Sequence, residues 1–69
     1  MEELQISLAA ARVNAGMTQE YVAKVMHVSK QTIVNWEKGY SEPTISQSRE
    51  LSKIYHMPLK YIFLPEKSN

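Results

Sequence analysis

The fold is decided by residues 18–39, which run TQEYVAKVMHVSKQTIVNWEKG. Thr18 and Ser29 each carry a hydroxyl that can accept a hydrogen bond from the free N–H groups in the first turn of a following helix. Gly39 suits the left-handed residue that closes a helix. The stretch therefore predicts two short helices, one from Gln19 to about Met26 and one between Ser29 and Gly39, joined by a tight turn.

The apolar side chains of these two helices recur at helical spacing and predict one shared inward face. Ala23 is small at the point where the two helices would cross most closely. Larger apolar residues around it would fix the crossing angle, and Trp36 is assigned to this core and not to a base-stacking role. The pattern is typical of a helix-turn-helix unit from Gln19 to Lys38. The larger inward residues are Val22, Met26, Val28, Ile33 and Trp36.

The opposite face of the second helix has a composition that favours base reading. Its positions are Lys30, Gln31, Val34, Asn35 and Lys38, which form one continuous stripe without an acidic residue. The two amides can bond bidentately to adenine, and the valine can contact a thymine methyl. A plain solvated face is the weaker alternative, because such a face usually mixes Glu with Lys.

Three further helices are predicted around this unit, which gives an all-α, compact bundle of five helices in a single domain, residues 1–69. Pro43 and Pro58 mark the breaks before the last two helices, and Gly16 follows the first. Residues 65–69 are expected to form a frayed tail. The predicted ranges are Glu2 to Asn14, about Ile45 to Tyr55, and about Leu59 to Leu64. Their candidate core residues are Leu4, Leu8, Ala11 and Ala15 in the first helix, and Ile45, Leu51, Ile54 and Tyr55 in the fourth.

The composition excludes several classes of function. The 69 residues include no cysteine, so there is no disulfide and no thiolate ligand, and all seven acidic residues are Glu. The two glycines stand far apart, which rules out a clustered phosphate-binding loop. No nucleophile, acid pair or metal cluster is visible, so an enzyme is the least favoured class. The acidic start at Met1, Glu2 and Glu3 is unlike a signal peptide and favours a soluble, cytoplasmic protein.

Two histidines occupy similar positions near the ends of predicted helices. His27 in residues 25–29 and His56 in residues 54–58 each lie between two apolar residues. A metal-binding or pH-sensing role is the weaker interpretation, because no cysteine or aspartate accompanies them. We expect both histidines to be turn residues.

The chain resembles the phage repressor and Cro type of helix-turn-helix proteins, also called the xenobiotic response element family. The resemblance covers nearly the whole chain and is carried by residues 17–23 (MTQEYVA), 28–33 (VSKQTI) and 36–39 (WEKG), together with Pro43 ahead of the helix that contains Leu51. It implies a lambda repressor-like fold and binding to double-stranded DNA. His27 and His56 depart from the family pattern, which prefers glycine at these turn positions.

The resemblance also implies roles for individual residues. Arg12 matches an arginine that pairs with the glutamate matched by Glu37, which would connect the first helix to the end of the third. The residues implied to contact bases are Ser29, Lys30, Gln31 and Asn35, to which the stripe adds Val34. The residues expected to contact phosphates are Thr18, Gln19, Lys38 and Tyr40.

The C-terminal apolar cluster is larger than one short helix needs to cover a small core, which favours a homodimer interface formed by part of it, while the sequence does not distinguish which of its residues face outward. Its members are Leu59, Tyr61, Ile62, Phe63 and Leu64. The predicted function is therefore a sequence-specific, double-stranded DNA-binding transcriptional regulator of bacterial or phage type, a repressor that needs no cofactor. The alternative is a protein-interaction module, such as an antitoxin or bridging factor, that uses the same fold to bind a protein partner.

Overall fold

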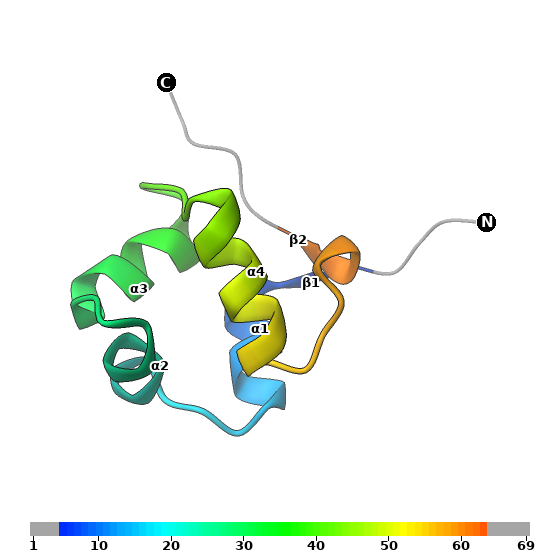
Figure 1. The fold of residues 1–69 in the computed structure, drawn as a ribbon, viewed down its shortest axis with the longest axis horizontal. Coiled ribbons are helices and arrows are strands. Elements are labelled where there is room, and N and C mark those ends of the chain that lie inside the picture. The colour runs from blue at the N-terminus through cyan, green and yellow to red at the C-terminus, as the bar shows by residue number, and fades with distance from the viewer. Residues whose placement is uncertain (1–4, 64–69) are drawn as a thin grey trace.

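The computed structural model describes residues 5–63, which form four α-helices, one turn of 3₁₀ helix and two very short strands (Figure 1). Helices α2 and α3 lie side by side, α1 and α4 lie next to them, and the strands are on the far side of the molecule. The bounds are β1 Ile6–Ser7, α1 Leu8–Asn14, α2 Gln19–Met26, α3 Lys30–Lys38, α4 Ile45–Ile54, η1 Leu59–Tyr61 and β2 Ile62–Phe63.

A side-chain hydroxyl caps the start of every α-helix in residues 5–63. Thr18 accepts a hydrogen bond from the backbone N–H of Tyr21, and Ser29 accepts one from that of Thr32, so both predicted caps are confirmed. The other two caps are Ser7 for α1 and Thr44 for α4, where Gln47 completes a capping box. These bonds satisfy N–H groups that a helix start otherwise leaves free, and they set the boundaries of α2 and α3.

All four α-helices also end in the same way. A residue with positive φ follows each helix, and its N–H donates to the carbonyl three positions earlier, while the next N–H donates to the carbonyl five positions before it. This pattern is the Schellman motif. Gly16 and Gly39 fill two of the left-handed positions, and His27 (φ 58°) and His56 (φ 54°) fill the others. Both histidines are turn residues, as the sequence predicts.

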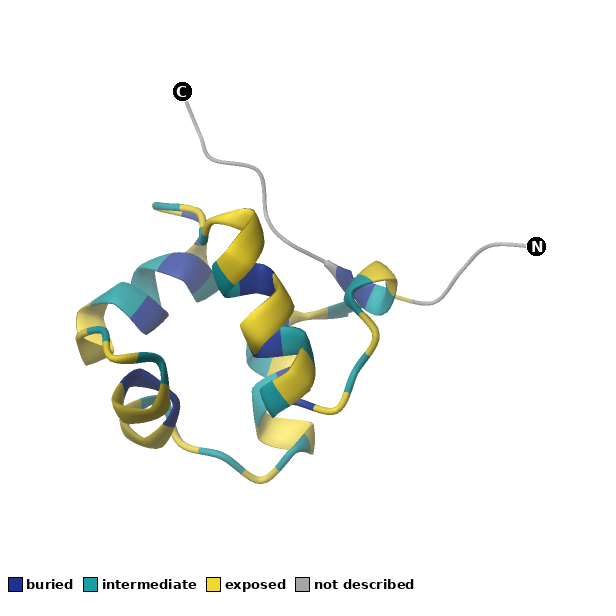
Figure 2. Cartoon of the chain, viewed as in Figure 1, coloured by how far each residue is buried: buried dark blue, intermediate teal, exposed yellow. Residues whose placement is uncertain are grey.

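The core lies where the inner faces of the helices meet (Figure 2). Ala23 and Trp36 are each only 4% exposed, which confirms that both the small residue of α2 and the tryptophan of α3 face the core. The methionines at 17, 26 and 57 pack against this core from its margin. The buried hydrophobic residues are Leu8, Ala11, Val22, Ala23, Ile33, Trp36, Leu51, Tyr55 and Ile62.

The first helix is shorter than predicted, because it begins at Leu8 and not at Glu2. Ile6 and Ser7 are extended and form β1, and the Ser7 hydroxyl accepts a hydrogen bond from the backbone N–H of Ala10 at 3.0 Å. A serine that caps a helix has extended backbone angles, so the helix cannot continue through it toward the N-terminus. Leu4, a predicted core residue, lies outside the described residues.

The prediction of a fifth helix from about Leu59 to Leu64 is wrong. Leu59–Tyr61 forms a single 3₁₀ turn, and Ile62–Phe63 forms β2, which pairs in parallel with β1 in the register Ile6 with Ile62 and Ser7 with Phe63. Pairing with β1 offers the backbone of these β-favouring residues hydrogen bonds that a frayed last turn lacks. Leu64 and residues 65–69 lie outside the described range.

Ile45 was also predicted to lie in the core, and this prediction is wrong. The residue is 73% exposed. It is the first residue of α4, directly after the Thr44 cap, and the buried positions of this helix are Ser48 and Leu51. The buried face of α4 therefore begins one turn later than the apolar pattern indicates.

The buried Tyr55 leads to a prediction about alkaline pH. Burial, followed by the negative charge of Glu37, raises the pKa of the Tyr55 phenol from 10.0 to about 12, although Arg12 acts in the opposite direction. The folded state thus disfavours the phenolate, and the unfolded chain releases this proton first. Stability from this residue is fully present below pH 10 and is lost as the pH rises from about 10 to about 12.

The free energy of unfolding, measured by urea denaturation across this pH range, should fall more steeply for the native chain than for Tyr55→Phe. The phenylalanine variant keeps the ring and removes the ionisable group, so the difference between the two proteins isolates the contribution of the Tyr55 phenol. Parallel curves for the two proteins would show that Tyr55 contributes nothing to the alkaline loss.

Candidate nucleic-acid interface

The exposed face of α3 carries the stripe of residues that the sequence predicts to face DNA. Ile33 and Trp36, at 1% and 4% exposure, point into the core and fix the orientation of the helix. On the other side, Lys30, Gln31 and Lys38 are exposed, and Val34 and Asn35 are partly exposed. The structure therefore places these five residues together on one outward face.

Two of these residues are bonded to each other. The Nε2 of Gln31 donates to the Oδ1 of Asn35 at 2.9 Å, one helical turn further along α3. The spacing of four positions, at which side chains on a helix are neighbours, is visible in the sequence. The two amides are a coupled pair in the free protein.

Lys30 has a partner that the sequence analysis missed. Its Nζ lies 3.0 Å from the Oε2 of Glu20, at the start of α2, and both side chains are more than half exposed. The hydrogen bond from the Glu20 backbone N–H, and then the contact with Lys30, lower the pKa of the Glu20 carboxyl. The pair depends on the angle between α2 and α3, so no local spacing in the sequence indicates it. One acidic group therefore lies beside the face of α3.

The hydroxyl of Ser29, a predicted base contact, is occupied in the free protein. It accepts a hydrogen bond from the Thr32 backbone N–H at 3.1 Å and lies 2.9 Å from the Thr32 hydroxyl. Ser29 is exposed and Thr32 is partly exposed, so both hydroxyls lie at the N-terminal end of α3. Thr32 was not among the predicted site residues, although the cap spacing places it in this turn.

The predicted phosphate contacts fall into two groups. Thr18 and Gln19 stand at the start of α2, where the Thr18 hydroxyl is used as the helix cap. Lys38 and Tyr40 stand at the end of α3, with the lysine Nζ 6.0 Å from the centroid of the tyrosine ring. Tyr40 is 67% exposed. Both groups border α3, one through the adjoining helix and one through its own last turn.

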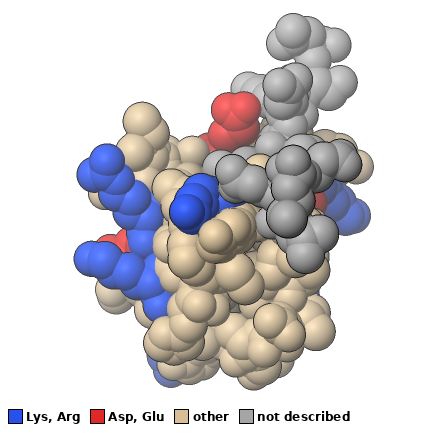
Figure 3. Space-filling model, turned by 90° about the vertical axis from the view of Figure 1, so that its right-hand side faces the viewer, with Lys and Arg blue, Asp and Glu red and all other residues tan. Residues whose placement is uncertain are grey.

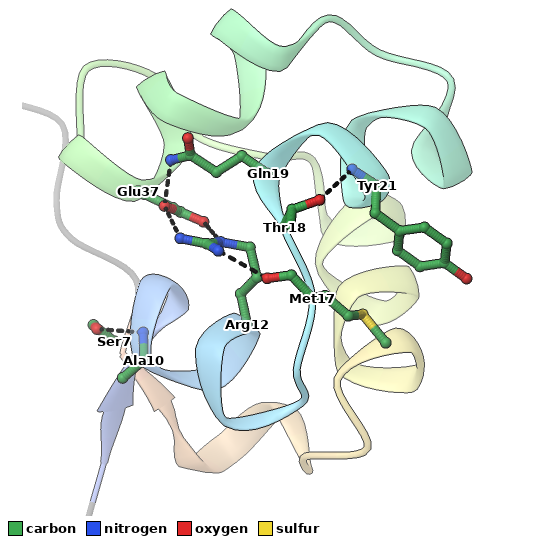
Figure 4. A network of polar contacts seen from close by, with 8 residues as sticks. All are labelled: Ser7, Ala10, Arg12, Met17, Thr18, Gln19, Tyr21 and Glu37. Carbon is green, nitrogen blue, oxygen red and sulfur yellow. Dashed lines mark hydrogen bonds and ion pairs between the residues drawn. The ribbon is translucent and has the colours of Figure 1, made fainter.

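A network of charged hydrogen bonds connects these elements (Figure 4). The Nε of Arg12 lies 2.8 Å from Oε2 of Glu37, and its Nη2 lies 3.4 Å from Oε1. Arg12 also donates to the carbonyl of Met17 at 2.8 Å, and Gln19 donates its amide to Glu37 at 3.0 Å. The Arg12 and Glu37 side chains are 14% and 7% exposed, and the hydrogen bond to Glu37 raises the pKa of Arg12. The network holds α1, the start of α2 and the end of α3 in one arrangement.

The predicted dimer residues are divided by the structure. Ile62 is 5% exposed and belongs to the core, so it is not in the part of the cluster that could face a partner. Leu59 and Tyr61 are partly exposed. The side chain of Phe63 and all of Leu64 lie outside what the structure describes. On the face that includes the strands, Lys and Arg gather mainly along the left margin, and most of the lower part is neither basic nor acidic (Figure 3).

Within residues 5–63, no group of three or more His, Cys, Asp or Glu side chains lies close enough together to hold a metal ion. No helix in this range is long and apolar enough to span a membrane.

Comparisons with known proteins agree with the geometry of α2 and α3. The family model described as "Helix-turn-helix" matches residues 8–62. An uncharacterized HTH-type transcriptional regulator of Methanocaldococcus jannaschii is 36% identical over 50 residues, which cover 72% of this chain and 76% of that protein. Two uncharacterized HTH-type transcriptional regulators of Archaeoglobus fulgidus are each 32% identical over 53 residues, which cover 77% of this chain and 76% and 75% of those proteins.

No solved structure matches the chain significantly. The family match runs from the first residue of α1 to the first residue of β2, so it includes all four α-helices and the whole Arg12–Glu37 network. The chain belongs to the helix-turn-helix family of the phage repressor and Cro type.

Proposed function

We propose that this protein is a sequence-specific, double-stranded DNA-binding transcriptional repressor that inserts α3 into the major groove. The observation that carries the proposal is the two-sided character of α3: Ile33 and Trp36 are buried, while the opposite face combines cations, amides and one valine. A helix fits the major groove, and these side chains match the hydrogen-bonding and methyl groups of base edges. The relatives named as transcriptional regulators support a role in transcription regulation.

In this proposal the residues that border α3 bind phosphates. Lys38 and Tyr40 would contact one backbone segment, and Thr18 and Gln19 would contact another. Gln19 keeps one amide N–H free after its bond to Glu37, because a primary amide has two. Lys30 would exchange Glu20 for the DNA, which costs little because an exposed ion pair contributes little to stability. This role requires no cofactor and no catalytic step.

We expect two classes of DNA-binding variant. Gln31→Ala should weaken binding to the preferred site by about 1 to 3 kcal/mol and relax the preference at one base pair, because Gln31 faces base edges in this proposal. Lys38→Ala should weaken binding to all sequences alike and reduce the dependence on salt, because it removes a phosphate contact. Binding sites selected from a random DNA pool, followed by affinity measurements at two salt concentrations, would separate the two effects.

Lys53→Ala is the matched control, since it removes an exposed lysine from α4, away from α3. Equal losses for Gln31→Ala and Lys38→Ala on both specific and random DNA would contradict the assignment of the α3 face. A protein that selects no site, but retains a protein partner in a pull-down without DNA, would favour an antitoxin or bridging role in place of a repressor.

We further propose that the protein binds its site as a homodimer. One small module makes few base contacts, which gives limited discrimination against a genome of competing sites. A two-fold dimer would place its two α3 helices about 34 Å apart, one turn of DNA, on a near-palindromic site. The exposed parts of Leu59 and Tyr61 are candidates for its interface. Sedimentation of the protein with a selected duplex tests this, and one protein per duplex on a site without dyad symmetry would contradict it.

A further inference from the structure

The bond between Gln31 and Asn35 determines what the glutamine can still offer to a ligand. A primary amide has two N–H donors and one carbonyl oxygen. In this structure the Nε2 of Gln31 donates one N–H to the Oδ1 of Asn35 at 2.9 Å. Gln31 is exposed, and Asn35 is partly exposed on the same face of α3. The outward edge of Gln31 therefore carries one donor and one acceptor, side by side.

This edge is complementary to adenine and not to guanine. In the major groove adenine presents one acceptor, N7, and one donor, the N6 amino group, whereas guanine presents two acceptors, N7 and O6. An unrestrained glutamine can rotate its amide and offer both N–H groups to guanine. With one N–H held by Asn35, that rotation breaks a hydrogen bond, and only one donor remains available.

We propose that Asn35 is a specificity-determining residue that positions the Gln31 amide, so that Gln31 binds adenine and rejects guanine. The inference rests on the proposed function, because it assumes that α3 faces the major groove. The direction of the bond is essential to it: if Asn35 donated to the Gln31 oxygen, the glutamine would keep two free donors and would favour guanine. Whether the native chain prefers adenine or guanine at this base pair therefore shows which of the two amides donates the hydrogen bond.

The experiment compares sites selected from a random pool by the native chain, Gln31→Ala, Asn35→Ala and Asn35→Asp. The base contacted by Gln31 is the position whose preference disappears in Gln31→Ala. The native chain should prefer adenine there. Asn35→Ala frees the amide, so the adenine-to-guanine ratio at this position should fall by about tenfold, in line with the discrimination that one bidentate pair provides.

Asn35→Asp is the matched control, because a carboxylate oxygen can still accept the Gln31 N–H. This variant should keep the adenine-to-guanine ratio while binding all DNA more weakly, owing to its added negative charge. A duplex with 7-deazaadenine at the same position lacks the N7 acceptor and should bind the native chain about as weakly as a guanine site does. Unfolding midpoints of the variants should match the native value, since both residues lie on the outer face of α3.

The outcomes separate this inference from the proposed function. A native chain that selects no sequence overturns both. A selected sequence with guanine at the Gln31 position overturns the inference alone, because the proposed function requires only that a preference exists. An adenine preference that survives unchanged in Asn35→Ala also overturns it, since Gln31 would then need no positioning partner.

Discussion

Replacing Arg12 with alanine is expected to lower the free energy of unfolding by about 2 to 4 kcal/mol, well beyond the effect of losing an exposed ion pair. The guanidinium makes two contacts with the Glu37 carboxylate and a third with the Met17 carbonyl. Without it, a carboxylate that is only 7% exposed would keep Gln19 as its remaining partner. An uncompensated charge at such a position is costly, and the slight exposure of the pair places the loss near the lower end for buried pairs.

Urea denaturation of the native chain, Arg12→Ala and Arg12→Lys measures this loss. The lysine variant keeps the positive charge but lacks the planar fork that reaches Glu37 and Met17 together, so it should recover only part of the stability. The variant Arg12→Ala, Glu37→Gln removes the stranded charge and should be more stable than Arg12→Ala alone. A midpoint unchanged in Arg12→Ala would show that the network contributes nothing to the fold.

Replacing Trp36 with alanine is expected to be more damaging still, with a loss of about 3 to 5 kcal/mol. Its side chain is 4% exposed in the core and lies on the face of α3 opposite the outward stripe. Small domains have total stabilities of about 5 to 15 kcal/mol, so this single change approaches the lower end of that range. DNA binding should be lost together with the fold, although Trp36 itself faces away from any ligand of α3.

Circular dichroism during denaturation is the suitable measurement, because Trp36 is the only tryptophan and its replacement removes the fluorescence signal. Val34→Ala on the outer face of the same helix is the control. It removes an apolar side chain that is already partly exposed, so its midpoint should stay close to the native value. A Trp36→Ala protein that unfolds at the native midpoint would contradict the assignment of this residue to the core.

The sequence predicts the helix-turn-helix unit well because its determinants are local. The hydroxyls of Thr18 and Ser29 cap the helices that directly follow them, and Gly39 ends α3 within the same stretch. His27 and His56 could be placed in turns for the same reason, since the left-handed conformation depends on neighbouring backbone bonds. In each case the residue and the backbone groups that it contacts lie within a few positions of each other in the sequence.

Features that depend on tertiary geometry were not predictable in this way. Strands of two residues have no detectable period, so Ile62 was assigned to a helix although it pairs with Ile6. The contact between Glu20 and Lys30 requires the angle between two helices, which no spacing encodes. On the candidate site, the shared outward face of α3 was predictable from helical periodicity, whereas the identity of the bases it contacts remains a prediction.

The pairing of Ile6 with Ile62 has a topological consequence. Parallel neighbours in a sheet lie about 4.8 Å apart, and because β1 and β2 run in the same direction, the backbone near residue 5 and the backbone near residue 63 emerge at opposite ends of a ladder only two residues long. They emerge on the side of α1 and α4 that is remote from α2 and α3 (Figure 1). A linker longer than a hairpin turn, because it must run back along the parallel strands, could join these points and make the backbone nearly circular, with new ends opened in the loop between α3 and α4. Such a circular permutant would keep the helix-turn-helix unit continuous while removing the need for β1 and β2 to find each other across the length of the domain.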